Sequence, residues 1–244
     1  MTAAHDPAPE DAELHETPPE AVFALIEADP WLQTPRWLWE PACGPGRLVE
    51  ALQRAGHLVA ASDLYQYEGR WCAAEGTKRH WHRDFLDPVA DPLKRGVEAI
   101  VMNPPFSKAD AFVMMALARV PRVYALLPLG WMQGGAATGA RDELLDNPDF
   151  WRRCHPFRER LNDMHRDGWA GNRNRTTQKH AWYVFGKAQG RDEELAQRIG
   201  IPVTRRISLR GACASEAPQA TRAKGPRNGL GTQLSRAGIR SGQV

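Results

Sequence analysis

The chain has 244 residues, of which 42% are hydrophobic and 25% are charged, and its formal net charge is +3. This length and composition predict one globular domain with tails, which can bury a single core without disulfides. They exclude a chain that is disordered throughout, and the modest positive charge permits nucleic-acid binding without requiring it.

Membrane and metal sites are not expected. No apolar stretch approaches the roughly 18 residues of a membrane-spanning helix, and the acidic, proline-rich N-terminus is unlike a signal peptide. His80 and His82 lie on one face of a strand-like pattern, but no further ligands have suitable spacing, so no metal is expected there. The cysteines also lack paired metal spacing, which indicates a reducing compartment such as the cytoplasm. They are Cys43, Cys72, Cys154 and Cys213.

The first predicted helix begins after a tail. Residues 1–16 are predicted to be disordered because they are acidic and rich in proline. Thr17 and Glu20 have the spacing of a capping box, and Pro18 stands at the first helical position. A helix is therefore expected to run from here to about residue 28.

A strand, a glycine turn and a helix follow. Residues 37–40 form a short apolar run that ends in Glu40, and Gly44 and Gly46 come next. Because glycine has no side chain, a ligand can approach the backbone of this turn closely. The apolar periodicity of residues 46–56 predicts a helix. A dinucleotide fingerprint would need a third glycine, and that position is occupied by Val49.

Four acidic or amide side chains are predicted to meet at one edge of a sheet. Residues 57–63 form a second expected strand, and Asp63 at its carboxyl end can accept hydrogen bonds from ribose hydroxyls. Further strands are expected near 79–83, 97–102, 121–128 and 180–186, with a helix over 108–119 capped by the segment 107–110. Right-handed crossovers would place one set of side chains at the carboxyl edge of a parallel sheet. They are Glu40, Asp63, Asp84 and Asn103.

Asn103, Pro104, Pro105 and Phe106 are the most informative residues in the chain. Proline lacks an N–H and cannot continue a strand ladder, so the two prolines fix a stiff loop after the buried run 97–102. Asn103 and Pro104 supply carbonyl acceptors, and Phe106 supplies a flat apolar ring. Two acceptors beside a ring can hold a planar group with an amine, such as a nucleobase –NH2 or a side-chain amide.

Together these motifs resemble the class I S-adenosylmethionine-dependent methyltransferases, in particular the phage- and prophage-type N6-adenine DNA methyltransferases. The resemblance covers about residues 17–187 and implies a Rossmann-like α/β sheet, mostly parallel, with an antiparallel last strand. It implies S-adenosylmethionine as the cofactor and residues 103–106 as the catalytic loop. The cofactor-binding residues that it implies are Thr17, Glu40, Pro41, Cys43, Gly44, Gly46, Asp63, Leu64, Asp84, Phe85 and Asn103.

The methyltransferase domain is expected to span residues 17–190. Within it, residues 130–179 have no clear periodicity and interleave arginines with aromatic residues, which favours a substrate-binding insertion over scattered surface charge. Residues 191–244 are expected to form a short helix and a basic, disordered tail. This tail is either simply solvated or an arm that adds phosphate affinity.

The predicted function is methylation of the exocyclic N6 amine of adenine in DNA, by a monomer or weak dimer. One alternative is an RNA methyltransferase that acts on adenine or guanine amines, and another is a protein glutamine methyltransferase, whose amide would fit the same acceptors. A third is a cofactor-binding protein without activity that binds nucleic acid. Nucleic-acid substrates predict salt-sensitive binding, whereas a protein substrate need not show it.

Overall fold

The computed structural model describes residues 13–67, 80–88, 96–133, 139–146, 150–161, 179–187 and 206–209. These residues form a seven-stranded sheet with the order β3-β2-β1-β4-β5-β7-β6. The strands are β1 (Trp37–Glu40), β2 (Leu58–Asp63), β3 (His80–His82), β4 (Ala99–Met102), β5 (Arg122–Pro128), β6 (Phe150–Pro156) and β7 (His180–Lys187). The α-helices are α1 (Pro19–Ala28), α2 (Arg47–Arg54), α3 (Ala109–Arg119) and α4 (Ala140–Asp146). Short 3-10 helices are η1 (Pro30–Gln33), η2 (Phe106–Lys108) and η3 (Leu129–Gln133).

The sheet is parallel from β3 to β5 and antiparallel at its other end. β1 pairs in parallel with β2 and β4, while β7 runs antiparallel to both β5 and β6. The chain order reverses beside β1, and such a switch point opens a crevice at the carboxyl ends of the strands. The predicted α/β class, a mostly parallel Rossmann-like sheet with an antiparallel last strand, is confirmed.

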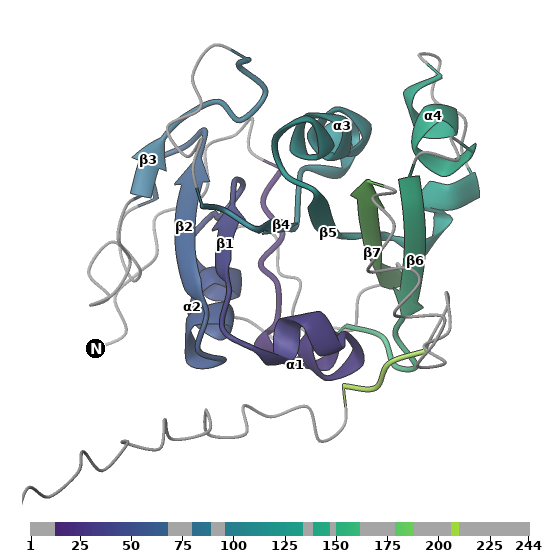
Figure 1. Cartoon of the computed structure of the whole chain (residues 1–244), viewed down its shortest axis with the longest axis horizontal. Coiled ribbons are helices and arrows are strands. Elements are labelled where there is room, and N and C mark those ends of the chain that lie inside the picture. The colour runs from purple at the N-terminus through teal and green to yellow at the C-terminus, as the bar shows by residue number, and fades with distance from the viewer. Residues whose placement is uncertain are drawn as a thin grey trace, which may run out of the picture.

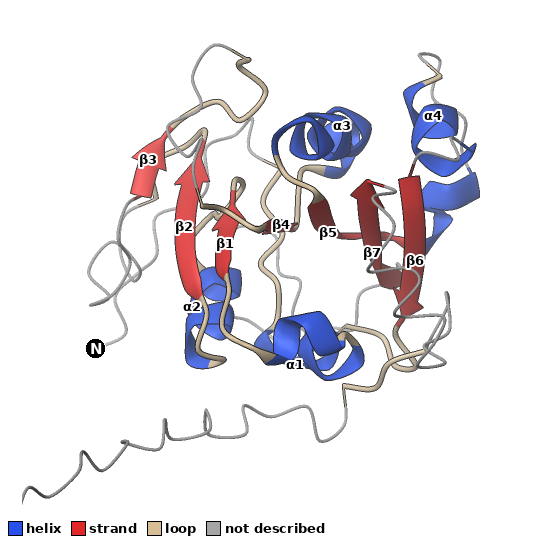
Figure 2. Cartoon of the chain, in the orientation of Figure 1, coloured by secondary structure: helices blue, strands red, loops and turns tan. Residues whose placement is uncertain are grey.

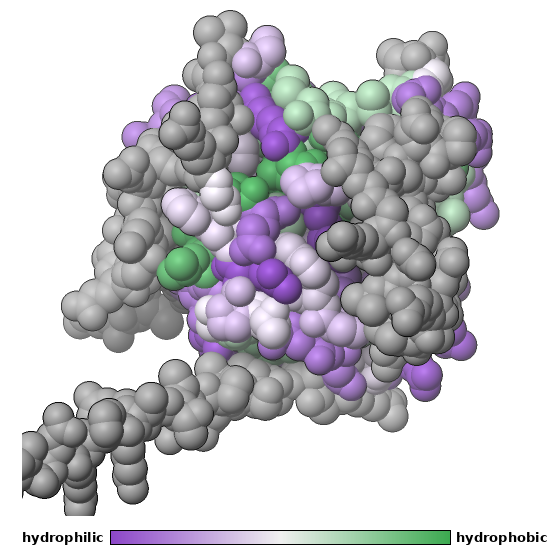
Figure 3. Space-filling view, in the orientation of Figure 1, coloured by the Kyte–Doolittle hydropathy of each residue, from purple (hydrophilic) through white to green (hydrophobic). Residues whose placement is uncertain are grey.

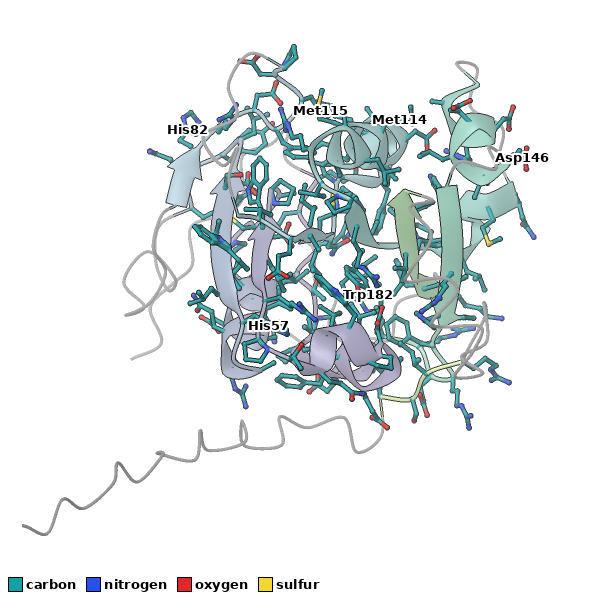
Figure 4. All side chains as sticks on the ribbon, in the orientation of Figure 1. His57, His82, Met114, Met115, Asp146 and Trp182 are labelled. Atoms are coloured by element: carbon teal, nitrogen blue, oxygen red, sulfur yellow. The ribbon has the colours of Figure 1, made fainter. Side chains whose placement is uncertain are left out.

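Helices cover both faces of the sheet. α1 and α2 lie on one side of it and α3 on the other (Figure 1). Successive strand residues alternate between two hydrophobic clusters, so that Leu38 packs with α1 and α2 whereas Trp39 packs with α3. Trp182 points from the sheet toward α1, where its indole N–H donates to the carbonyl of Ala21 at 2.8 Å (Figure 4). Apolar packing on both faces thus holds the sheet, and with it the carboxyl ends of its parallel strands, in place.

Part of the segment predicted to be irregular is regular. β6 and α4 both fall within residues 130–179, and β6 forms an edge strand of the core sheet (Figure 2). The interpretation of 130–179 as one irregular insertion is wrong for these elements. The sequence of residues 130–179 does not reveal β6, because this strand contains two arginines, as an edge strand of a sheet can.

Both predicted helix caps are also wrong. The N-cap of α1 is Pro18 and that of α3 is Lys108, and neither helix has a side-chain capping bond. The sequence predicted that two hydroxyls cap these helices, but both form hydrogen bonds elsewhere. Thr17 accepts from Asn103, and Ser107 donates to Glu13. These diversions tie the start of the chain to the loop after β4.

The remaining expectations concern the surface and the chain ends. None of the helices in the described ranges is long and apolar enough to cross a membrane. In the view of Figure 3, hydrophilic side chains cover the centre of the face and hydrophobic ones gather above it, toward α3. The expected helix after residue 190 lies outside the described residues, and so does most of the basic tail. Within that tail, Ile207 pairs with Phe157 through an isolated bridge.

Candidate functional site

A pocket lies where β1, β2 and β4 end. It brings together most of the predicted cofactor residues, drawn from segments far apart in the sequence. Those that line it are Thr17, Glu40, Pro41, Cys43, Gly44, Asp63, Leu64, Asp84, Phe85 and Asn103. Pro105 from the predicted catalytic loop lines it too. Gly46, Pro104 and Phe106 do not: Gly46 is the N-cap of α2, and Phe106 begins η2 beside the pocket.

Glu40 is a buried acid with an unused acceptor. Its Oε1 accepts from the N–H of Ala42 at 3.0 Å, whereas Oε2 has no hydrogen-bond partner among the described residues. Burial raises the pKa of Glu40 well above its usual value; the Ala42 N–H opposes this shift and the nearby Asp63 adds to it. A buried acceptor without a partner is costly, so a ligand that supplies a donor or a positive charge would relieve it.

Asp63 ties the glycine turn to β2. Its Oδ2 accepts from the N–H of Gly44 at 2.8 Å, and its Oδ1 accepts from Tyr65 at 2.9 Å. Burial raises the pKa of Asp63, against these backbone donors, which lower it. Gly44 has a positive φ of 50°, and a Cβ there would meet the side chain of Leu14 at 2.8 Å. The positive φ therefore favours glycine in this turn, and the Leu14 side chain packs closely against it.

One wall of the pocket is formed by Asp84, Phe85 and Leu64. The Asp84 carboxylate accepts from the N–H of Leu86 at 2.8 Å, which closes a tight turn after β3. Phe85 is buried, edge-on to Trp39 and tilted against Phe112. Leu64 is 41% exposed, so an apolar surface remains at the mouth of the pocket. This wall can receive a flat ring beside a polar turn.

The orientation of the Asn103 amide is fixed by its partners. Its Nδ2 donates to the carbonyl of His15 at 2.7 Å and to the hydroxyl of Thr17 at 3.1 Å. A backbone carbonyl can only accept, so the nitrogen, not the oxygen, must face His15. The Oδ1 atom is buried and has no hydrogen-bond partner among the described residues. The loop after β4 thus carries a fixed, unused acceptor at the edge of the pocket.

Phe106 contacts two imidazole rings. His15 is stacked on it, with centroids 5.1 Å apart and ring planes 14° apart. His180 approaches it at 5.6 Å and 37°. The sequence predicted a flat apolar ring on which a planar group can stack, and the structure shows this ring partly buried beside two other flat side chains. The position accepts planar rings, as its present neighbours demonstrate.

The sequence interpretation missed the segment that covers this loop, residues 13–17, which we call the strap. It was assigned to a disordered tail that ended at residue 16, and that expectation is wrong for its last four residues. Leu14 is buried against Gly44, and Glu16 pairs with Arg47 at 3.1 Å. Each strap contact joins distant parts of the chain, so the local sequence gives little indication of it. The one local indication is Leu14, a single apolar residue among polar ones just before Thr17.

The residues that line the pocket fit S-adenosylmethionine. The cofactor carries a sulfonium and an ammonium, ribose hydroxyls and an adenine ring. Buried carboxylates, including the unused Glu40 Oε2, suit the first two kinds of group, and the wall near Phe85 suits a ring. No cluster of three potential metal ligands occurs in the part of the chain that the structure describes.

No protein-family model matches the chain, and no curated protein matches it. Solved structures do. One is a Pyrococcus horikoshii protein proposed to be an RNA methyltransferase: 14% identical, with a TM-score of 0.50, over 72% of this chain and 88% of that one. Another is the type I restriction-modification methyltransferase subunit of Streptococcus thermophilus: 13% identical, with a TM-score of 0.51, over 73% of this chain and 46% of the subunit. At this level of identity the likeness establishes a methyltransferase-type fold, and the match spans less than half of that subunit.

Proposed function

We propose that the protein transfers a methyl group from S-adenosylmethionine to the exocyclic N6 amine of adenine in DNA. The observation that carries this proposal is the Asn103 amide. Its nitrogen is bound by the strap, and its oxygen is a buried acceptor without a partner among the described residues. An amine donor is the complementary group for such an acceptor.

The chain's own residues divide the work between two sides of the pocket. Glu40, Asp63 and the turn at Gly44 bind and orient the cofactor, which supplies an activated methyl group when bound. Asn103 Oδ1 and the Pro104 carbonyl accept the two amine hydrogens. That arrangement directs the nitrogen lone pair away from the acceptors and stabilises the positive charge that develops on nitrogen. Phe106 stacks on the base, so alignment of the amine is the main contribution of the protein.

Duplex DNA would have to release the target base before it could reach this loop, because the amine of a paired base is held inside the helix. A single-stranded substrate avoids that cost. RNA is the second candidate substrate, because the two structural neighbours do not separate the two polymers: one is proposed to act on RNA, and the other is a restriction-modification subunit. The same acceptors would also fit a glutamine amide.

The test is nucleoside mass spectrometry after the purified protein is incubated with labelled S-adenosylmethionine and unmethylated DNA, with RNA in parallel. We expect N6-methyldeoxyadenosine in the DNA. Label in RNA alone would move the proposal to the second candidate. Label in neither polymer, with cofactor still bound, would reject nucleic-acid methylation and direct the search to protein amides.

A further inference from the structure

The strap contacts both ends of the loop that carries the proposed chemistry. Glu13 Oε1 accepts from the N–H of Phe106 at 2.9 Å. Glu13 Oε2 accepts from the N–H of Ser107 at 3.2 Å and from its hydroxyl at 2.7 Å. One carboxylate therefore binds the backbone on both sides of the Phe106 Cα. These donors lie at the start of η2, where N–H groups have no partner within the helix.

The next strap residues hold the other end of the same loop. The His15 carbonyl and the Thr17 hydroxyl take both hydrogens of the Asn103 amide. Thr17 is 2% exposed and directly precedes the N-cap of α1, so its hydroxyl is held by the body of the domain. Acceptor and ring are thus both set by residues that lie about 90 positions earlier in the chain.

A third set of contacts anchors the strap itself. Leu14 packs against the turn at Gly44, and Glu16 pairs with Arg47 in the first turn of α2, with both side chains largely buried. The strap therefore spans from the glycine turn to the loop after β4. Because the strap contacts both the glycine turn and the loop after β4, it cannot shift against one of them without breaking contacts with the other.

We propose that the strap positions the NPPF loop (residues 103–106), and that Glu13 is its positioning residue, holding Phe106 where the target base must stack. This inference rests on the proposed methyl transfer. In this proposal Glu13, which also lines the pocket, acts through the loop. Removing the carboxylate leaves the Phe106 and Ser107 N–H groups without their acceptor and lets the ring move. A displacement of about 1 Å in an aligned site can cost about a hundredfold in rate.

The test compares Glu13→Ala and Glu13→Gln with Glu20→Ala, a matched loss of one negative charge. Glu20 is exposed on α1, and we expect Glu20→Ala to behave like the wild type. For Glu13→Ala we expect kcat to fall about 10- to 100-fold, with the cofactor Kd, measured by calorimetry, within about twofold of wild type. Glu13→Gln keeps one acceptor oxygen and should fall between the two. Unchanged kcat in Glu13→Ala, or an equal loss in Glu20→Ala, would overturn the proposal.

Hydrogen exchange separates this inference from the proposed function. In Glu13→Ala, the Phe106 and Ser107 amides should lose protection while the β4 amides keep theirs. Unchanged protection would show that the strap does not hold the loop. If the loop loosens but the wild type methylates neither DNA nor RNA, the proposed function fails, and the catalytic part of this inference fails with it.

Discussion

The two edges of the sheet bury polar groups in opposite ways. At the amino ends of the strands, Asp29 accepts from the N–H of Trp31 at 3.0 Å and from the phenol of Tyr124 at 2.9 Å, with Arg122 3.7 Å away. At the carboxyl ends, Glu40 and Asn103 each keep a buried oxygen without a hydrogen-bond partner among the described residues. His57 and His82 mark the two edges in Figure 4.

This difference separates groups that stabilise the fold from groups that are available to bind a ligand. A buried polar atom without a partner costs free energy, and a fold tolerates few of them. At the amino edge Asp29, Arg122 and Tyr124 bind one another. Tyr124 keeps its proton: burial, and then the negative Asp29, raise the pKa of its phenol well above the usual value. The carboxyl edge retains unused acceptors where the pocket lies. Substitutions at the two edges should therefore affect different measurements.

The largest effect is expected from Asp29→Ala at the amino edge. It leaves Arg122 buried without its counter-ion, and the loss of one partner of a buried pair typically costs about 3–5 kcal/mol. Urea unfolding should show this loss, while the activity of each folded molecule stays unchanged. Glu98→Ala is the control: its 3.1 Å pair with Arg36 is 40% exposed on the Glu98 side and should contribute less than about 1 kcal/mol. Equal losses in both variants would contradict the comparison.

Asn103→Ala at the carboxyl edge should show the reverse behaviour. Removing the proposed acceptor should lower kcat by a factor on the order of 10² or more, as the loss of an oxyanion-hole donor does. The cofactor Kd should remain close to wild type, and unfolding should change far less than in Asp29→Ala. Single-turnover methylation assays measure the first effect. Full activity in this variant would remove Asn103 from the mechanism.

Glu40→Gln tests whether an unused buried acid weakens the fold. Because burial raises its pKa in the folded protein, the unfolded chain releases this proton first as pH rises. The wild type should therefore lose stability from about pH 4.3, the ordinary value for Glu, up to the raised pKa. Without cofactor, Glu40→Gln should melt higher than the wild type at pH 7 but not at pH 4. Its cofactor affinity should fall about tenfold, because a charged partner is lost. Identical melting profiles across this range would argue against the assigned shift.

His57 at the amino edge should show the opposite dependence on pH. Its Nδ1 accepts from the N–H of Arg36 at 3.2 Å, and burial, helped by the Arg36 charge, lowers its pKa to about 4. The unfolded chain takes up this proton first, so stability is complete above about pH 6.5 and is lost as pH falls toward 4. His57→Asn keeps an acceptor and should lose less stability over this interval. An acid transition as steep as that of the wild type would assign the effect to other groups.

The smallest effect is expected from His15→Ala. The backbone carbonyl that binds Asn103 remains, and only the ring stacked on Phe106 is lost. An aromatic pair contributes about 0.5–1.5 kcal/mol, so kcat should change by less than about tenfold and clearly less than in Glu13→Ala. Steady-state kinetics on the same substrate measure both variants. A larger loss in His15→Ala would mean that the ring, not the carbonyl, sets the loop.

The sequence predicted the elements whose periodicity is strong. The strands ending at Glu40, Asp63 and Met102 were expected within two residues of their observed starts, because buried parallel strands are short apolar runs. β6 could not be found in this way. Arg153 and His155 are both buried in it, so its pattern does not alternate between apolar and polar residues.

The site divides in a similar manner. The glycine turn and the loop after β4 are local patterns, and the sheet topology brings them to one pocket, as predicted. The strap is different because its contacts depend on tertiary structure. Glu13 has no local partner among the described residues, and nothing in the sequence beside it indicates that its carboxylate binds the backbone at Phe106 and Ser107.

Under the proposed function, the imidazole stacked on Phe106 would also select for the size of the target ring. A base that reaches this face must replace the His15 ring, so only the difference between the two stacking energies favours its entry. A single six-membered ring gains little over an imidazole. A purine covers more of the phenyl ring and gains more, before any hydrogen bond to Asn103 forms. Under that function, competition with the His15 ring would disfavour pyrimidine amines relative to purine amines.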